Sequence, residues 1–159
     1  MTAEKKHNST MDSAGRFLLP ASILQDWKAE MEVGFVINRS PDDLCLTLYT
    51  MDEWKNAKER LDKLNVLNPE NRKYIRYFMG GKTEIKPDSK NRILIPKHLQ
   101  EYAKLGRELF ITKISASIVE IWDPLLYEEQ DRTYVANNKP FIQETNKLLF
   151  PNAPDLYVS

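Results

Sequence analysis

Two arginines, Arg16 and Arg92, each stand four residues after an aspartate in segments that repeat one another. Residues 12–20 read Asp-Ser-Ala-Gly-Arg-Phe-Leu-Leu-Pro, and residues 88–96, 76 positions later, read Asp-Ser-Lys-Asn-Arg-Ile-Leu-Ile-Pro. A guanidinium is planar, permanently charged and rich in donors, so it can bind a phosphate or the O6 and N7 edge of guanine. We therefore expect Arg16 and Arg92, each placed directly after a tight turn, to be the primary DNA contacts.

Other polar residues of the two turns could add weaker DNA contacts. Lys90 would bring a point charge to a phosphate, and Asn91 would reach a base or simply hold the turn. Ser13 and Ser89 would donate weaker hydrogen bonds. Each contact is modest when taken alone.

The aspartates and the glycine of the motif are expected to support the arginines. A phosphate would repel Asp12 and Asp88, so we expect them to accept hydrogen bonds from the turn backbone or to orient the arginines. Gly15 accepts a positive φ without steric cost. A single copy of this motif would favour an ordinary surface turn with a pairing of Asp and Arg, but the duplication favours a shared function.

Composition narrows the class of protein. The chain has 159 residues, 42% of them hydrophobic, which suffices for one substantial core or two half-cores that share an interface. Lys plus Arg and Asp plus Glu both total 23, so any DNA site must come from local clustering or from several subunits. The start lacks a secretion signal and no apolar run is long enough for a bilayer, so we expect a cytoplasmic protein with no membrane partner. The single Cys45 lies in an apolar run and is expected to be buried.

Both copies of the motif are followed by the same series of elements. The apolar residues after each arginine predict a short buried strand, and the proline after them predicts the first turn of a helix. A hairpin then follows in each copy. The predicted segments are strand 17–19, a helix from Pro20, and hairpin strands 33–37 and 44–49, then a helix from Pro96 and hairpin strands 109–111 and 118–122.

A pair of helices is predicted between the copies. Thr50, with a glutamate three residues later, forms a capping box for the first helix, and Asn68 caps the second. Arg72 and Arg76 fall on one face of the second helix, where a solvated surface is the simpler interpretation and a phosphate contact the alternative.

The expected organisation has four parts. A short helix should follow the second hairpin, and the punctuation of the last part by Asn and Pro indicates loss of regular structure there, with docking on a neighbouring subunit or disorder left open. The parts are a disordered terminus at 1–6, a first repeat with its helical pair at 7–79, a second repeat at 80–130, and an irregular tail at 131–159.

The duplicated Asp-x-x-x-Arg element, with its apolar residues and proline, resembles the hallmark of the bacterial MraZ family over roughly residues 7–127. The order of segments 77–81, 87–96 and 118–122 matches that family. The resemblance implies an α+β fold, a duplicated swapped-hairpin β-barrel of the AbrB and MraZ type with short flanking and inter-repeat helices. Two residues depart from the family pattern: Ala14 stands where a basic residue is usual, and Asn91 where glycine is usual.

The resemblance also implies a function. It implies a transcriptional regulator that forms a ring-shaped homo-oligomer and binds double-stranded DNA at direct repeats in the promoter of the division and cell-wall gene cluster. Such a protein would be associated with the nucleoid. An alternative is a ring-forming scaffold for protein partners whose DNA binding is weak or lost, and a third is an antitoxin-like relative, although such proteins resemble one half of this chain.

The sequence gives little support for an enzymatic function. Two aspartates could form an acid-protease dyad, but that motif has glycine two residues after the aspartate, where this chain has Ala14 and Lys90. No nucleophile with a base, phosphate loop or metal cluster is evident, and His7 and His98 lack partners at ligand spacing. We therefore expect no enzyme, no cofactor, no metal and no small-molecule substrate.

Overall fold

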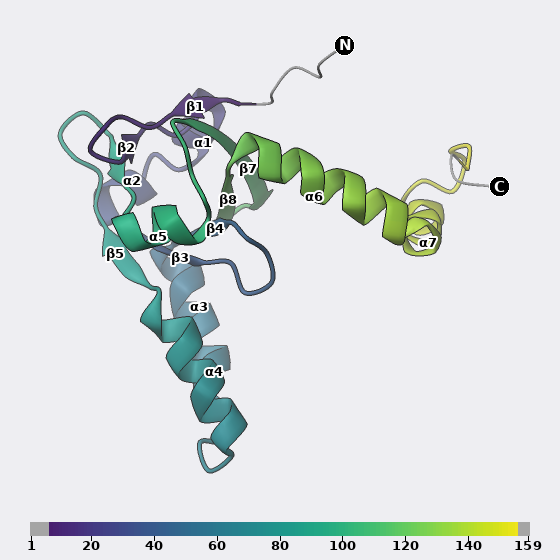
Figure 1. The fold of residues 1–159 in the computed structure, drawn as a ribbon, viewed down its shortest axis with the longest axis horizontal. Coiled ribbons are helices and arrows are strands. Elements are labelled where there is room, and N and C mark those ends of the chain that lie inside the picture. Colours follow the sequence, from purple (N-terminus) through teal and green to yellow (C-terminus); the bar gives the residue numbers. More distant parts are fainter. Residues whose placement is uncertain (1–6, 156–159) are drawn as a thin grey trace. The chain divides into compact units, whose positions relative to one another are not determined.

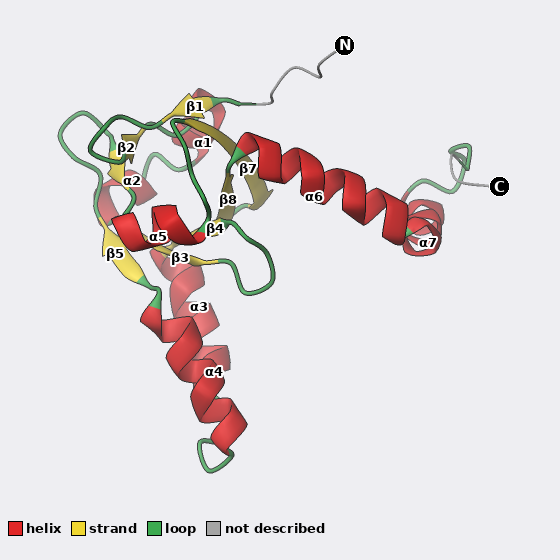
Figure 2. Ribbon diagram, in the orientation of Figure 1, coloured by secondary structure: helices red, strands yellow, loops and turns green. Residues whose placement is uncertain are grey.

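The computed structural model describes residues 7–155, so the terminus predicted to be disordered, residues 1–6, lies outside the described residues. The chain divides into two compact units, one ending at Pro124 and one beginning at Leu125. Figure 1 labels the elements and Figure 2 distinguishes helices from strands. In chain order the elements are β1 (Ser9–Thr10), β2 (Arg16–Phe17), α1 (Ala21–Asp26), α2 (Glu30–Val33), β3 (Phe35–Arg39), β4 (Leu46–Thr50), α3 (Met51–Asp62), α4 (Pro69–Gly80), β5 (Thr83–Ile85), β6 (Ile93–Leu94), α5 (Lys97–Tyr102), β7 (Glu108–Ser115), β8 (Ile118–Trp122), α6 (Pro124–Asn137) and α7 (Lys139–Leu149).

The first unit is built on a curled antiparallel sheet in which the two repeats interleave (Figure 1). Its six strands run in the order β1-β7-β8-β4-β3-β5, and β2 pairs with β6 in a second, two-stranded sheet. The order is symmetric, because β1, β7 and β8 occupy the places that β5, β3 and β4 occupy on the other side. Strand β1 of the first repeat pairs with the second hairpin, and β5 of the second repeat pairs with the first hairpin. The predicted α+β fold of two swapped, interleaved repeats is confirmed.

The strand register preserves the duplication. Leu46 pairs with Ile121 and Leu48 with Val119, and these two pairs exchange when the repeats are superposed at a spacing of 73 residues. Phe17 pairs with Ile93, its own equivalent at the motif spacing of 76 residues. The local symmetry axis therefore passes between the two Asp-x-x-x-Arg motifs.

The three apolar residues after each arginine are alternately buried and exposed, as in an extended strand. Phe17 and Leu19 are buried while Leu18 is 48% exposed, and the equivalent Leu94 is also 48% exposed between two buried isoleucines. This period of two is that of a strand lying over a core. The strand predicted at 17–19 is nevertheless shorter than expected, since ladder pairing covers Arg16–Phe17 only.

Both hairpins are confirmed, although both strands of the first begin two residues later than predicted, at Phe35 and at Leu46. Val33 was predicted to begin a strand but ends the short helix α2, and β3 begins at Phe35. Gly34 between them has a φ of 100°, and a Cβ there would lie 2.9 Å from the carbonyl oxygen of Ile85. A residue with a side chain would collide with β5, so the chain can turn from α2 into β3 only at glycine.

The helical pair begins where the capping residues predict. The Thr50 side chain accepts from the Glu53 backbone N–H at 3.2 Å, and the Asn68 side chain accepts from the Glu70 backbone N–H at 2.9 Å. Trp54 of α3 stacks on Phe78 of α4 with ring centroids 5.4 Å apart. These contacts close a small apolar cluster between the helices and the sheet.

Two further residues singled out in the sequence, Arg72 and Cys45, can be located in the structure. Arg72 donates from Nη1 to the carbonyl oxygen of Val66 at 2.8 Å, so it ties down the loop between α3 and α4, and a phosphate contact by Arg72 or Arg76 stays a prediction. Cys45 is buried, and burial raises the pKa of its thiol, which makes it an inert core residue.

The second unit corrects the expectation for the tail. Residues 131–149 were predicted to be irregular, but they lie in α6 and α7. Pro140 was taken as a sign of irregularity, yet it stands in the first turn of α7, where its missing N–H removes no helical hydrogen bond.

The predicted repeat boundaries, 7–79 and 80–130, stay predictions. None of the helices in the described part is long and apolar enough to cross a membrane.

Candidate nucleic-acid interface

In the first turn one carboxylate organises both the backbone and the arginine. Asp12 Oδ1 accepts from the backbone N–H groups of Ala14 at 3.0 Å and Arg16 at 2.9 Å. Asp12 Oδ2 accepts from Arg16 Nε at 2.9 Å. Gly15 has a φ of 90°, the left-handed conformation that lets the chain reverse within these five residues.

The second turn repeats this geometry. Asp88 Oδ1 accepts from the backbone N–H groups of Lys90 and Arg92, both at 2.9 Å, and Asp88 Oδ2 accepts from Arg92 Nε at 2.8 Å. Asn91 has a φ of 62°, so it takes the left-handed place that Gly15 holds in the first turn. Asparagine tolerates this region better than other residues with side chains, and the substitution for glycine leaves the turn intact.

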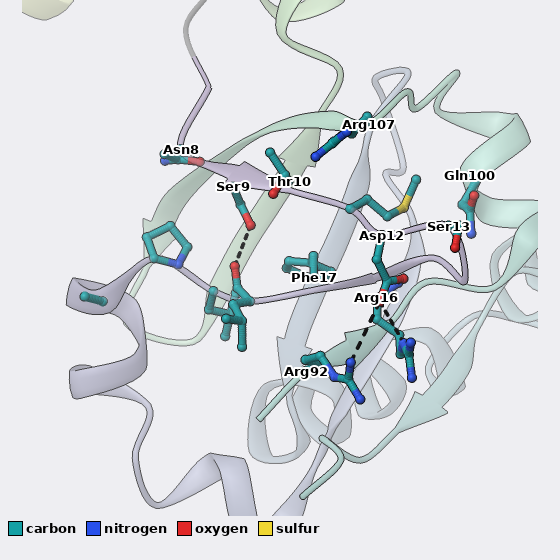
Figure 3. Close-up of a pocket in the computed structure, with 15 residues that line it drawn as sticks. Asn8, Ser9, Thr10, Asp12, Ser13, Arg16, Phe17, Arg92, Gln100 and Arg107 are labelled. Atoms are coloured by element: carbon teal, nitrogen blue, oxygen red, sulfur yellow. Dashed lines mark hydrogen bonds and ion pairs between the residues drawn. The ribbon is translucent and has the colours of Figure 1, made fainter. Parts of the chain in front are cut away.

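Pairing of β2 with β6 brings the two turns together. Arg92 Nη1 lies 4.0 Å from Asp12 Oδ2, so the second arginine approaches the carboxylate of the first turn. Arg16 and Arg92 both border one hollow of about 970 Å³, and their side chains are 38% and 29% exposed. Figure 3 shows the two guanidinium groups on the same side of this hollow, which we call the arginine hollow. The fifteen residues around it are Asn8, Ser9, Thr10, Met11, Asp12, Ser13, Arg16, Phe17, Leu18, Leu19, Pro20, Ala21, Arg92, Gln100 and Arg107.

The hydrogen bonds fix the charge state of the turns. Those from the backbone N–H groups of Arg16 and Arg92 are the main cause of lowered pKa values at Asp12 and Asp88 respectively. Each aspartate engages the Nε side of its arginine. The terminal amines carry most of the donors of an arginine. That of Arg92 at Nη1 lies 4.0 Å from Asp12 Oδ2, and both arginine side chains are partly exposed.

The same lowered pKa values argue against a protease dyad. A carboxylate pair that shares a proton needs one member with a raised pKa. Asp12 and Asp88 are both shifted in the opposite direction and each is held by an arginine. The two turns therefore lack the raised pKa that a shared proton requires.

A carboxyl titration by NMR should show these shifts directly. We expect Asp12 and Asp88 in the folded chain to titrate with midpoints below their ordinary value of 3.8. Because a lowered pKa stabilises the fold only while the group is ionised, this contribution is complete above pH 3.8 and is lost as the pH falls through the folded-state pKa. The chain unfolded in urea is the control. Midpoints at or above those of the unfolded chain would contradict the hydrogen bonding described for the turns.

The other residues predicted to contact DNA do not all lie at the arginine hollow. Ser13 borders the arginine hollow, whereas Ser89, Lys90 and Asn91 are exposed on the second turn and do not border it. The structure thus joins the two arginines and the two aspartates in one surface, with the polar residues of the second turn beside it. DNA contacts by these side chains stay predictions.

Sequence reasoning missed two residues of the arginine hollow. Gln100 of α5 donates from Nε2 to the carbonyl oxygen of Ile95 at 2.8 Å, which ties the helix to the strand before it. Arg107 arrives from the loop before β7, because the backbone N–H of Met11 donates to its carbonyl oxygen at 2.7 Å. Neither belongs to the repeated motif, and only the pairing of β1 with β7 brings Arg107 to the first turn.

Comparisons with known proteins agree with the duplicated geometry. The family model described as "MraZ protein, putative antitoxin-like" matches the chain in two segments, residues 3–76 and 78–149. A protein of Caldanaerobacter subterraneus subsp. tengcongensis named "Transcriptional regulator MraZ" is 35% identical over 128 residues, which cover 80% of this chain and 85% of the relative. Proteins of the same name from Flavobacterium psychrophilum and Desulfitobacterium hafniense are 35% and 36% identical, over 75% and 77% of this chain and 75% and 82% of the relatives.

Proposed function

The chain belongs to the MraZ family, and we propose that it is a transcriptional regulator that binds double-stranded DNA through its paired Asp-x-x-x-Arg turns. One observation carries the proposal: the pairing of β2 with β6 sets Arg16 and Arg92 on one partly exposed surface, with each aspartate bound to the Nε side of its arginine. The name that the relatives share is that of a regulator and not of an enzyme, which supports a role in binding and not in catalysis.

Each residue of the surface has a role in this proposal. Arg16 and Arg92 bind phosphate or guanine through their terminal amines. Asp12 and Asp88 stay bound to the turns and hold the two guanidinium planes in place, which reduces the entropy lost when DNA binds. The peripheral contacts come from Lys90, Ser13, Ser89 and Asn91.

A chain without net charge requires several copies of this surface to hold DNA. With 23 basic and 23 acidic residues, one protomer has little long-range attraction for a polyanion. We propose that the protein acts as a ring-shaped homo-oligomer on direct repeats in the promoter of the division and cell-wall gene cluster, as the family resemblance implies. Each bound protomer raises the effective concentration of the next, so modest contacts add up to firm binding. A cytoplasmic, nucleoid-associated location follows from this function.

A salt titration of DNA binding tests the proposal. The probe is a fluorescently labelled duplex from the region directly upstream of the coding sequence, and the competitor is a duplex of the same composition in scrambled order. We expect log Kd to change linearly with log salt, with a slope of about 0.9 for each phosphate contacted, and preference for the upstream duplex. Light scattering measures the oligomer in parallel. An intact oligomer that binds neither duplex at low salt would instead favour the protein-interaction scaffold.

A further inference from the structure

The second turn has a basic residue that the first turn lacks. The first turn instead has an arginine beside it that comes from outside the motif. The second turn has Lys90 where the first has Ala14. Arg107 lies beside the first turn, and the register makes the uncharged Val33 its equivalent in the other repeat, because Ser9 pairs with Leu109 and Ile85, 76 residues after Ser9, pairs with Phe35. Each motif therefore has one additional cation, which comes from the turn itself in the second repeat and from the other repeat in the first.

The backbone places Arg107 next to the first turn. Its carbonyl oxygen accepts from the Met11 N–H at 2.7 Å, one residue before Asp12, and Thr10 pairs with Glu108. The Arg107 side chain borders the arginine hollow and is exposed, and within the described part of the chain it has no hydrogen-bond or ion-pair partner. Figure 3 shows it beside Thr10, across the hollow from the other two arginines.

The second motif has no cation in the equivalent place. Val33, the residue equivalent to Arg107, ends α2 and has an exposed apolar side chain. The two motifs therefore differ in this neighbouring residue as well as in the turn residue.

The charge of the arginine hollow suits an anion. Arg16, Arg92 and Arg107 border it, and Asp12 is the one carboxylate among the fifteen residues around it. Asp12 is already engaged by Arg16 and by two backbone N–H groups. The hollow thus keeps an excess of positive charge, and among residues 7–155 no acidic group pairs with Arg107.

We propose that Arg107 is a DNA-binding residue that contacts a phosphate beside the first turn and replaces the basic residue missing at Ala14. The proposal rests on the DNA-binding function proposed above. It adds a contact that the repeated motif does not contain, and it assigns the arginine hollow to one strand of the DNA backbone. A phosphate contact of this kind adds affinity without sequence preference.

The test measures binding of the full chain to the labelled upstream duplex at several salt concentrations. We expect Arg107→Gln to weaken binding about fivefold to tenfold and to reduce the salt slope by about 0.9 per bound protomer, equally for upstream and scrambled duplexes. Arg107→Lys should keep most of the affinity. Ala14→Lys, added to Arg107→Gln, should restore the affinity and the slope, because it supplies a cation to the same turn.

Arg132→Gln is the matched control, since it removes an exposed arginine of α6 that is not part of the arginine hollow. Unchanged binding by Arg107→Gln, an equal loss in Arg132→Gln, or no recovery with Ala14→Lys would overturn this inference while the unaltered chain still binds DNA. Failure of the unaltered chain to bind any duplex would overturn the proposed function, and this inference with it. Thermal unfolding of each variant checks the fold.

Discussion

Replacement of Arg92 by alanine is expected to reduce the affinity for the upstream duplex by about 100-fold or more, since a lost guanidinium contact of about 1–3 kcal/mol recurs in every bound protomer. The change also removes the positive charge that pairs with the Asp88 carboxylate. Asp88 has Arg92 as its ion-pair partner in the described structure, so the variant leaves Asp88 with its backbone hydrogen bonds but with no cation beside Oδ2. Anisotropy titration gives Kd, and light scattering should show an oligomer of unchanged mass.

Arg16→Ala should have a smaller effect on the same measurement. Asp12 lies 4.0 Å from Arg92 Nη1 as well as beside Arg16, so it keeps a cation nearby when Arg16 is removed. The cation that we propose to replace the basic residue missing at Ala14 is Arg107, and Arg16→Ala leaves it in place. An equal loss from Arg132→Ala, an exposed position of α6, would contradict both the ranking and the site, because it would indicate a general effect of charge.

The local geometry of the site could be predicted from the sequence because it depends on neighbouring residues. Aspartate, then glycine or asparagine, then arginine within five positions specifies the turn, and both copies fold alike even though Gly15 and Asn91 differ. The side-chain caps of Thr50 and Asn68 are equally local and were predicted correctly, although the Thr50 N–H donates to the Ser117 carbonyl oxygen and not to Glu53 as in a full capping box. A repeat at fixed spacing then indicated that two such units share a core.

Features that depend on long-range pairing were not accessible in this way. Arg107 reaches the first turn through a ladder between β1 and β7, about 100 residues apart in the chain, and no spacing within the motif signals it. The prediction of an irregular tail was wrong for a different reason. Prolines and asparagines were read as breaks in regular structure, but Pro140 is in the first turn of α7, where proline is compatible with a helix.

The symmetry axis between the motifs makes Phe17 the residue whose loss should most affect the fold. Its side chain is 2% exposed and its strand pairs it with Ile93, which is fully buried, so both repeats pack against it. We expect Phe17→Ala to lower the free energy of unfolding by about 3–5 kcal/mol, because it removes the ring and leaves a cavity that interleaved strands cannot close. Urea unfolding followed by tryptophan fluorescence measures the change.

Leu18→Ala is the control for that experiment, since Leu18 is the next residue and is 48% exposed. It should change the free energy of unfolding by no more than about 0.5 kcal/mol. Because the repeats exchange strands, Phe17→Ala should lower the stability of both at once and keep a single cooperative transition. Two separated transitions, with the second repeat as stable as before, would mean that each motif is supported by its own half of the chain, and the common surface for Arg16 and Arg92 would lose its structural basis.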